Sequence, residues 1–216
     1  MSLLLIDNLS KSFKKKKVLN GLNLSVEKGE VIGLVGRSGV GKSVLVKTLI
    51  GFLKPDAGYL AIHSESKFPI GFSMQENAIY DSLTVRQNLK YFSEIYKIPR
   101  KERKNGIKLV LDKLNLEEFG DVLVKKLSGG TKKRVDIACA LLTEPEIIVL
   151  DEPFLGLDPV LVDSLSQFIL LLQKSGKTII VSSHRTDELS KICTRLILLK
   201  GGKLYQINKS QLKNVY

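Results

Sequence analysis

The chain has 216 residues, of which 44% are hydrophobic and 26% are charged, a composition typical of one globular domain that can bury a proper core. Apolar runs such as 168–172 and 196–199 are far shorter than the roughly 18 residues that suggest a transmembrane helix. The N-terminus lacks the basic start and long apolar stretch of a secretory signal. The two cysteines have no metal or redox spacing. We therefore expect a cytoplasmic protein without a membrane span.

Basic residues outnumber acidic ones, 34 to 22, which gives a net charge of +12. Most of the excess lies in residues 86–134, which contain 14 Lys and Arg but only six Asp and Glu, with basic clusters at 100–104 and 132–134. This charge agrees with a solvated helical surface, with a surface near anionic lipid headgroups, and with one that meets nucleic acid. Charge alone does not separate these three interpretations.

The first third of the chain is predicted to form short strands around one helix. The helix is expected at 42–52 and ends at the turn 54–58, which contains Pro and Gly. The lysine run 14–17 is expected to be an exposed turn. The strands are expected at 3–6, 22–26, 31–35, 59–63 and 70–73.

The pattern then changes to helix over 84–116, and another helix is predicted to end near Leu142. Beyond it strands and helices alternate, which predicts a parallel sheet wrapped by helices. Within a single domain spanning 1–216, the stretch 84–130 is expected to be an inserted helical subdomain. The alternating elements are expected at 147–150, 159–174, 178–182, 186–192 and 196–199.

A phosphate-binding loop is predicted directly after the apolar run 31–35. Its eight residues fit the pattern GxxxxGK[ST] between a strand and a helix, the context that makes the motif credible. Its glycines let backbone N–H groups approach phosphates, Lys42 reaches the β- and γ-phosphates of ATP, and Ser43 offers a hydroxyl to Mg²⁺. The nucleotide-binding residues of this loop are Gly36, Arg37, Ser38, Gly39, Val40, Gly41, Lys42 and Ser43.

Two acids end the buried strand predicted at 147–150. Asp151 is placed to hold Mg²⁺ directly or through water, as the second acid of phosphate-loop ATPases does. Glu152 should point elsewhere, because side chains alternate along extended backbone.

Between the loop and the acids stands LSGGT at 127–131. These three motifs, in this order, resemble the ATP-binding cassette (ABC) ATPases over almost the whole chain. The resemblance implies an α/β fold: a phosphate-loop NTPase core with a parallel sheet, a small antiparallel β-subdomain and an inserted helical subdomain. The short span 59–75 implies a pared-down β-subdomain. Thr131 stands where the family has Gln, which puts any contact of that amide in doubt.

The resemblance also implies roles in catalysis. Glu152 matches the base that polarises the attacking water, and Gln75 matches the Q-loop residue that touches Mg²⁺ or its water. His184 follows a predicted strand and matches the switch histidine that contacts the γ-phosphate. Phe13 resembles the aromatic that stacks on adenine, with Val18 nearby; an ordinary packed Phe is the alternative.

The signature implies a dimer. In the family its serine and glycines contact the ATP bound on the opposite subunit, so Ser128, Gly129 and Gly130 would serve a second chain's nucleotide. Asp158 matches the D-loop aspartate that crosses to the partner. Two ATP would then lie between two chains arranged head to tail, as a homodimer or with a similar subunit.

The implied function is an ATP-binding and ATP-hydrolysing subunit of an ABC transporter that drives separate membrane subunits from the inner face of the cell membrane. The phrase at 75–89 looks most like exporter-type (ABC-2) subunits, and 75–96 would dock the membrane subunit through apolar residues such as Ile79 and Tyr80. The alternative is a single-cassette ABC ATPase in iron–sulfur assembly or another non-transport role. Nucleic acid is not the expected partner.

Overall fold

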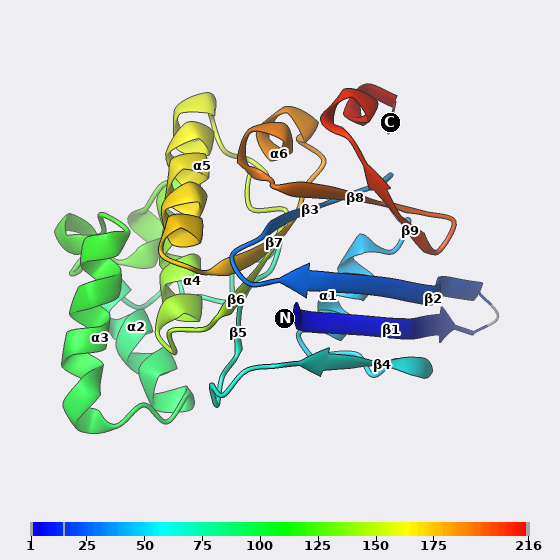
Figure 1. Ribbon diagram of the computed structural model, residues 1–216. Helices are drawn as coiled ribbons and strands as arrows, with labels where there is room; N and C mark the ends of the chain where they lie inside the picture. The colour runs from blue at the N-terminus through cyan, green and yellow to red at the C-terminus, as the bar shows by residue number, and fades with distance from the viewer. Residues whose placement is uncertain (1, 15, 215–216) are drawn as a thin grey trace.

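The computed structural model describes residues 2–14 and 16–214. Two sheets lie side by side, with helices packed around the larger one (Figure 1). The strand order of the larger sheet is β5-β6-β7-β3-β8-β9, and that of the smaller is β2-β1-β4. The family-level expectation of an α/β core with a small antiparallel sheet and a helical subdomain is confirmed.

The larger sheet is parallel from β5 to β8, and its edge strand β9 runs antiparallel to β8. In such sheets ligands bind beyond the carboxyl ends of the parallel strands. The hairpin from β8 to β9 was not predicted, although Gly201-Gly202 between them, at φ 58° and 74°, is a recognisable turn signal. The strands are β3 (Val31–Val35), β5 (Ile70–Ser73), β6 (Ile147–Asp151), β7 (Thr178–Ser182), β8 (Arg195–Lys200) and β9 (Lys203–Ile207).

The smaller sheet contains longer strands than the sequence predicts. The segments expected at 3–6 and 22–26 are parts of β1 (Ser2–Phe13) and β2 (Lys16–Glu27), and β4 is Ala57–Ile62. The pairing of β1 shifts between Ile6 and Leu9, where Asn8 has a left-handed φ of 48°. Such irregularities interrupt the two-residue alternation by which a strand is recognised. Lys14 forms the turn as expected and Lys15 lies outside the described residues, whereas Lys16 and Lys17 belong to β2.

The helical stretch 84–116 consists of two helices. Helix α2 (Val85–Ile95) begins with a capping box between Thr84 and Gln87. The chain turns at Lys97, whose φ is 55°, and Pro99 precedes α3 (Arg100–Lys113), because proline fixes the backbone where a helix can start. The other helical elements are α1 (Lys42–Leu49), η1 (Glu117–Phe119), η2 (Val124–Lys126), α4 (Gly129–Leu141), α5 (Pro159–Lys174), α6 (Thr186–Ile192) and η3 (Lys209–Asn214).

Alternate residues of the central strands enter two different cores. In β3, Val31 and Val35 join the core shared with α2 to α6, while Ile32 and Leu34 face the core shared with α1 and the smaller sheet. Burial on both faces explains why these strands read as continuous apolar runs. None of the helices in residues 2–14 and 16–214 combines the length and apolarity needed to cross a bilayer.

Candidate active site

The phosphate loop lies between the end of β3 and the first turn of α1 (Figure 1). Gly41 caps α1 at a left-handed φ of 115°, and a Cβ there would lie 2.7 Å from Cγ1 of Val18. Only glycine suits both that conformation and that contact. The backbone therefore comes close at a helix N-terminus, where unpaired N–H groups favour an anion.

Lys42 turns back into the loop that carries it. Its Nζ donates to the carbonyl oxygen of Gly36 at 2.6 Å and to that of Arg37 at 3.5 Å. Burial lowers the pKa of Lys42, and the carboxylates of Glu152 and Asp151 oppose this shift. The loop thus holds a buried cation next to two acids at the end of another strand. Within the loop, the N–H of Val40 donates to the carbonyl oxygen of Arg37, and the Val40 side chain packs against the core beside α1.

Asp151 and Glu152 are oriented by the neighbouring strand β7. Asp151 lies opposite Ser182 in the parallel pairing and accepts a hydrogen bond from the Ser182 hydroxyl. The N–H of Glu152 donates to the Ser182 carbonyl oxygen at 2.9 Å. Glu152 lies outside β6 and has a left-handed φ of 49°, so the expected strand alternation does not set the direction of its side chain. That direction is set by a turn, which the hydrogen bond to Ser182 holds.

His184 joins the buried carboxylate to the loop lysine. Its Nε2 lies 3.3 Å from Nζ of Lys42 and 3.3 Å from Oε1 of Glu152, and its backbone N–H donates to Oε2 of Glu152 at 3.2 Å. Burial raises the pKa of Glu152, which is 8% exposed, while His184 and Lys42 oppose the rise. One ring nitrogen can accept from Lys42 or donate to Glu152 but cannot do both, so the tautomer selects the partner.

These groups line one cleft of about 360 Å³, within the usual size range of small-ligand pockets. Nine of the eighteen site residues expected from the sequence line this cleft. Sequence reasoning missed Leu155 in the lining and Ser182 beneath it; the position of Ser182 at the end of the strand 178–182 was a usable signal. The lining residues are Val18, Ser38, Gly39, Gly41, Lys42, Ser43, Val44, Gln75, Glu152, Leu155 and His184.

Other expected residues lie outside this cleft. Phe13, at the end of β1, is 44% exposed and has the Lys11 ammonium 5.8 Å from its ring centre. Ser128 caps α4 and accepts from the N–H of Thr131 at 3.2 Å. Asp158 caps α5 and accepts from the N–H of Leu161 at 3.0 Å. Neither cap residue is among those that line the cleft around Lys42.

The signature glycines differ in their surroundings. A Cβ on Gly130 would lie 2.5 Å from Leu161, whereas one on Gly129 would meet nothing within 4 Å. Ser128 and Gly129 are exposed. This end of α4 is therefore packed on one side and open on the other.

An unforeseen buried network ties α4 to the segment before Gln75. Lys133 was grouped with a basic cluster in the sequence, but it is 5% exposed and donates to the Met74 carbonyl oxygen at 2.7 Å. Asp136 accepts from Ser73 Oγ at 2.5 Å and from the Ala78 N–H at 2.9 Å. Burial lowers the pKa of Lys133 and raises that of Asp136, and their attraction opposes both shifts. A solvated surface is thus the wrong interpretation for Lys133.

Comparison with known proteins identifies the family. The family model for ABC transporters matches residues 19–155. The lipopolysaccharide export system ATP-binding protein LptB of Haemophilus influenzae is 33% identical over 100% of this chain and 97% of its own length. A protein of Chlorella vulgaris described as a probable sulfate/thiosulfate import ATP-binding protein, CysA, is 35% identical over 96% of this chain and 92% of its own.

Among solved structures, CbiO1 of Clostridium perfringens, part of the ABC transporter complex CbiONQ, superposes with a TM-score of 0.87 at 30% identity. The match covers 99% of this chain and 91% of CbiO1. The named relatives include both export and import proteins, so similarity establishes the family without its transport direction. The chain therefore belongs to the ABC transporter family, as an ATP-binding subunit that hydrolyses ATP to power transport by membrane subunits.

Proposed function

We propose that the cleft around Lys42 is the site of ATP hydrolysis and that Glu152 is its general base. The observation that carries the proposal is the placement of His184 Nε2 at 3.3 Å from both Lys42 Nζ and Glu152 Oε1. A cation for the phosphates and a carboxylate for the attacking water thus both lie within reach of one imidazole nitrogen. Transfer of a γ-phosphoryl group to water needs both a cation at the phosphates and a group that positions the water.

In this proposal Glu152 accepts the proton of the water that attacks the γ-phosphorus. Its burial raises its pKa, which makes the carboxylate a stronger base than an exposed one. His184 orients Glu152 through its backbone N–H and presents its ring to the γ-phosphate. Lys42 leaves its contacts with the loop carbonyl oxygens and stabilises the charge on the β- and γ-phosphates.

Mg²⁺ fits the donor chemistry of the site. Ser43 and Gln75 line the cleft, and the Asp151 carboxylate lies close enough to Lys42 to influence its pKa. Hydroxyl, amide and carboxylate oxygens are the ligands that Mg²⁺ prefers alongside phosphate oxygens. We assign these three residues to the metal, which when bound neutralises phosphate charge.

Residues outside the cleft would complete it in a dimer. Ser128, Gly129 and Gly130 stand at the N-terminus of α4, where backbone N–H groups favour an anion, and Ser128 and Gly129 are exposed. We propose that they contact the γ-phosphate of a second chain, with Asp158 crossing the interface and Phe13 stacking on adenine. Residues 1–216 then act as one ATPase domain with 84–130 as its helical subdomain.

For the whole complex we propose an exporter-type transporter, with this chain at the cytoplasmic face of the cell membrane. The exporter assignment rests on the resemblance of 75–89, since the relatives include import and export proteins. The alternative of a non-transport ATPase is not retained, because the matching family and the named relatives are transporters.

The dimer proposal has a direct test. In size-exclusion chromatography, the Glu152→Gln protein should dimerise with ATP–Mg²⁺ but not with ADP–Mg²⁺, because the γ-phosphate supplies the differential contact. Adding Ser128→Arg should abolish the dimer and leave nucleotide binding by the monomer unchanged. A dimer that forms without nucleotide and survives Ser128→Arg would refute the arrangement.

A further inference from the structure

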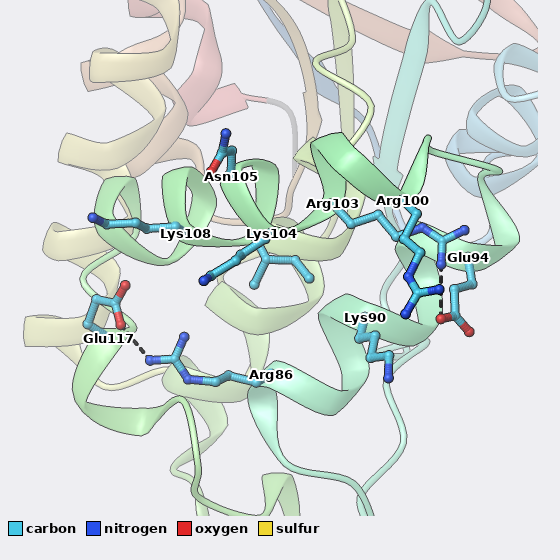
Figure 2. A pocket seen from close by; sticks show the side chains of 10 residues that line it. Arg86, Lys90, Glu94, Arg100, Arg103, Lys104, Asn105, Lys108 and Glu117 are labelled. Carbon is cyan, nitrogen blue, oxygen red and sulfur yellow. Dashed lines mark hydrogen bonds and ion pairs between the residues drawn. The ribbon is translucent and has the colours of Figure 1, made fainter.

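A basic cleft lies between α2 and α3 (Figure 2), and its lining residues all differ from those of the cleft around Lys42. Its volume is about 710 Å³, in the range of ligand pockets. Arg86 and Lys90 reach it from α2, and Lys104 and Lys108 reach it from α3 (Figure 2). Among the described residues, its lining contains six cationic side chains and two carboxylates. The lining therefore carries a net charge of +4, a third of the +12 excess of the whole sequence.

The two carboxylates are already engaged at the ends of the cleft. Glu117 lies 2.7 Å from Nη2 of Arg86, and Glu94 lies 3.0 Å from Nη1 of Arg103. These pairs hold the two guanidinium groups in place, and Arg103 is fixed further by donating Nε–H to the Ile98 carbonyl oxygen at 2.7 Å. These contacts place the two guanidinium groups at the cleft before any ligand binds, and a side chain that is already placed loses less entropy on binding.

The remaining cations are left for a ligand. Within residues 2–14 and 16–214, none of Lys90, Arg100, Lys104 and Lys108 forms an ion pair with a carboxylate. Like charges that line one cleft repel one another, and an anion between them would relieve that repulsion. Lysine and arginine donors together match the oxygens of a phosphate.

The floor and the location of the cleft indicate the source of that phosphate. Ile107 lines the cleft and packs against the main core, so the site offers an apolar surface beneath its charged rim. Helix α2 also carries Tyr91, whose ring packs edge to face against Tyr80 in the segment expected to dock the membrane subunit. Arg86, Lys90 and Glu94 of the cleft belong to that same segment, 75–96, so the cleft adjoins the surface proposed to meet the membrane subunit.

We propose that the basic cleft binds the phosphate headgroup of an anionic phospholipid at the membrane surface. The proposal rests on the placement of this chain against a membrane subunit, as proposed above. Each basic residue near an anionic bilayer strengthens binding by roughly 1 kcal/mol, and the cleft gathers several such residues at one point. Contact with lipid would help to set the orientation of the helical subdomain.

Vesicle co-sedimentation of the purified full chain tests the proposal. Binding is expected to vesicles of three parts phosphatidylcholine to one part phosphatidylglycerol, and not to vesicles of phosphatidylcholine alone. Neutralising Lys90, Lys104 and Lys108 to Gln should lower the partition coefficient about 100-fold, since each charge contributes roughly fivefold. All three side chains are exposed, so the variant should keep its fold, which circular dichroism checks.

A matched control removes the same charge elsewhere. Lys54, Lys200 and Lys203 are also exposed and lie outside the helical subdomain, and their change to Gln should reduce vesicle binding much less. If the two triple variants lose vesicle binding equally, binding depends on net charge alone, and the proposal that the cleft binds lipid is overturned. Absence of binding to the phosphatidylglycerol vesicles would overturn it too.

Two further experiments test whether the cleft binds an anion other than a lipid headgroup. Titration calorimetry with inorganic phosphate, and filter binding of a short single-stranded RNA, are run on the same proteins. A cleft-dependent affinity for either of them without vesicle binding would overturn the lipid assignment. The vesicle assay needs neither ATP nor a membrane subunit, whereas the dimer test needs ATP, so failure of one proposal is distinguishable from failure of the other.

Discussion

The ammonium of Lys133 donates a 2.7 Å hydrogen bond to the carbonyl oxygen of Met74, the residue directly before Gln75. The same ammonium lies 3.7 Å from the Asp136 carboxylate, and the two side chains are 6% and 4% exposed. A buried ion pair adds little net stability, because desolvation offsets the attraction. Its effect is therefore mainly positional: it fixes the chain next to Gln75 relative to the helix that begins at the signature.

Lys133→Met should lower the free energy of unfolding by about 3–5 kcal/mol, because it leaves the Asp136 carboxylate buried without its cation. Urea denaturation followed by circular dichroism measures this. Lys132→Met is the matched control: Lys132 pairs with Asp81 at the surface, and exposed pairs contribute about 0–1 kcal/mol.

The double variant Lys133→Met/Asp136→Asn separates stability from positioning. It removes the uncompensated charge while Asn still accepts from the Ala78 N–H, so most of the lost stability should return. The Met74 carbonyl oxygen still lacks its donor, so kcat for ATP hydrolysis should stay below that of the parent protein. If both the free energy of unfolding and kcat returned to the parent values, the Lys133–Asp136 pair would have no role in positioning the chain next to Gln75.

The local parts of the site were predictable from the sequence. The phosphate loop is contiguous, and the end of one strand followed by a helix dictates its conformation, so its residues could be read one by one. The contact between Lys133 and Met74 could not be read in this way, because it depends on how α4 is rotated against the chain before Gln75. A run of three cations looks like surface until that rotation is known.

Glu152 illustrates a second limit. Its left-handed φ of 49° is unfavourable for a residue with a Cβ. The conformation is held because the backbone N–H of Glu152 donates to Ser182, which lies 30 residues further along the chain in another strand. The sequence places Ser182 at the end of a strand, but no local pattern shows that Ser182 contacts Glu152. The longer strands of the smaller sheet escaped prediction for a related reason: β1 pairs with β2 and β4 irregularly, with shifts at several points, and simple alternation does not survive them.

Glu152→Gln should lower the rate of ATP hydrolysis by about 100-fold or more, the scale of general-base catalysis. Binding of ATP should remain nearly unchanged, because the amide occupies the same space and the phosphates contact other groups. Lys42→Ala should weaken ATP binding instead. Glu65→Gln changes an exposed carboxylate and should change neither quantity; hydrolysis near the parent rate by the Glu152→Gln protein would remove Glu152 from its role.

The pH dependence of hydrolysis should report the environment of Glu152. A base must be deprotonated to act, and burial raises the pKa of this carboxyl above its ordinary value of 4.5. Activity should therefore fall on acidification at a higher pH than an exposed glutamate would allow. His184 is the largest influence opposing the rise, so His184→Ala should move the acid limb of kcat/KM to still higher pH. The substrate is the same in both assays, so its own ionisation does not affect the comparison, and an unmoved limb would contradict the assignment.

The surface around Tyr80 should bind the membrane subunit. Tyr80 is 45% exposed and its hydroxyl lies 3.1 Å from that of Tyr91, itself 38% exposed, so the two rings form an aromatic surface beside α2. Ile79, which the sequence offered as a second contact, packs instead against the main core, and a charge there would perturb the fold. Tyr80→Glu is therefore the informative change: it places a charge where an apolar contact is expected.

Tyr80→Glu should abolish co-purification of the membrane subunit from detergent extracts of native cells, while the isolated chain binds ATP as before. The expected loss follows from burying an unpaired carboxylate in an apolar contact, which is far more costly than losing the ring alone. Tyr205→Glu is the matched control, since Tyr205 is 49% exposed on β9, away from α2, and should leave co-purification intact. If Tyr80→Glu retains the membrane subunit, the partner docks elsewhere on this chain.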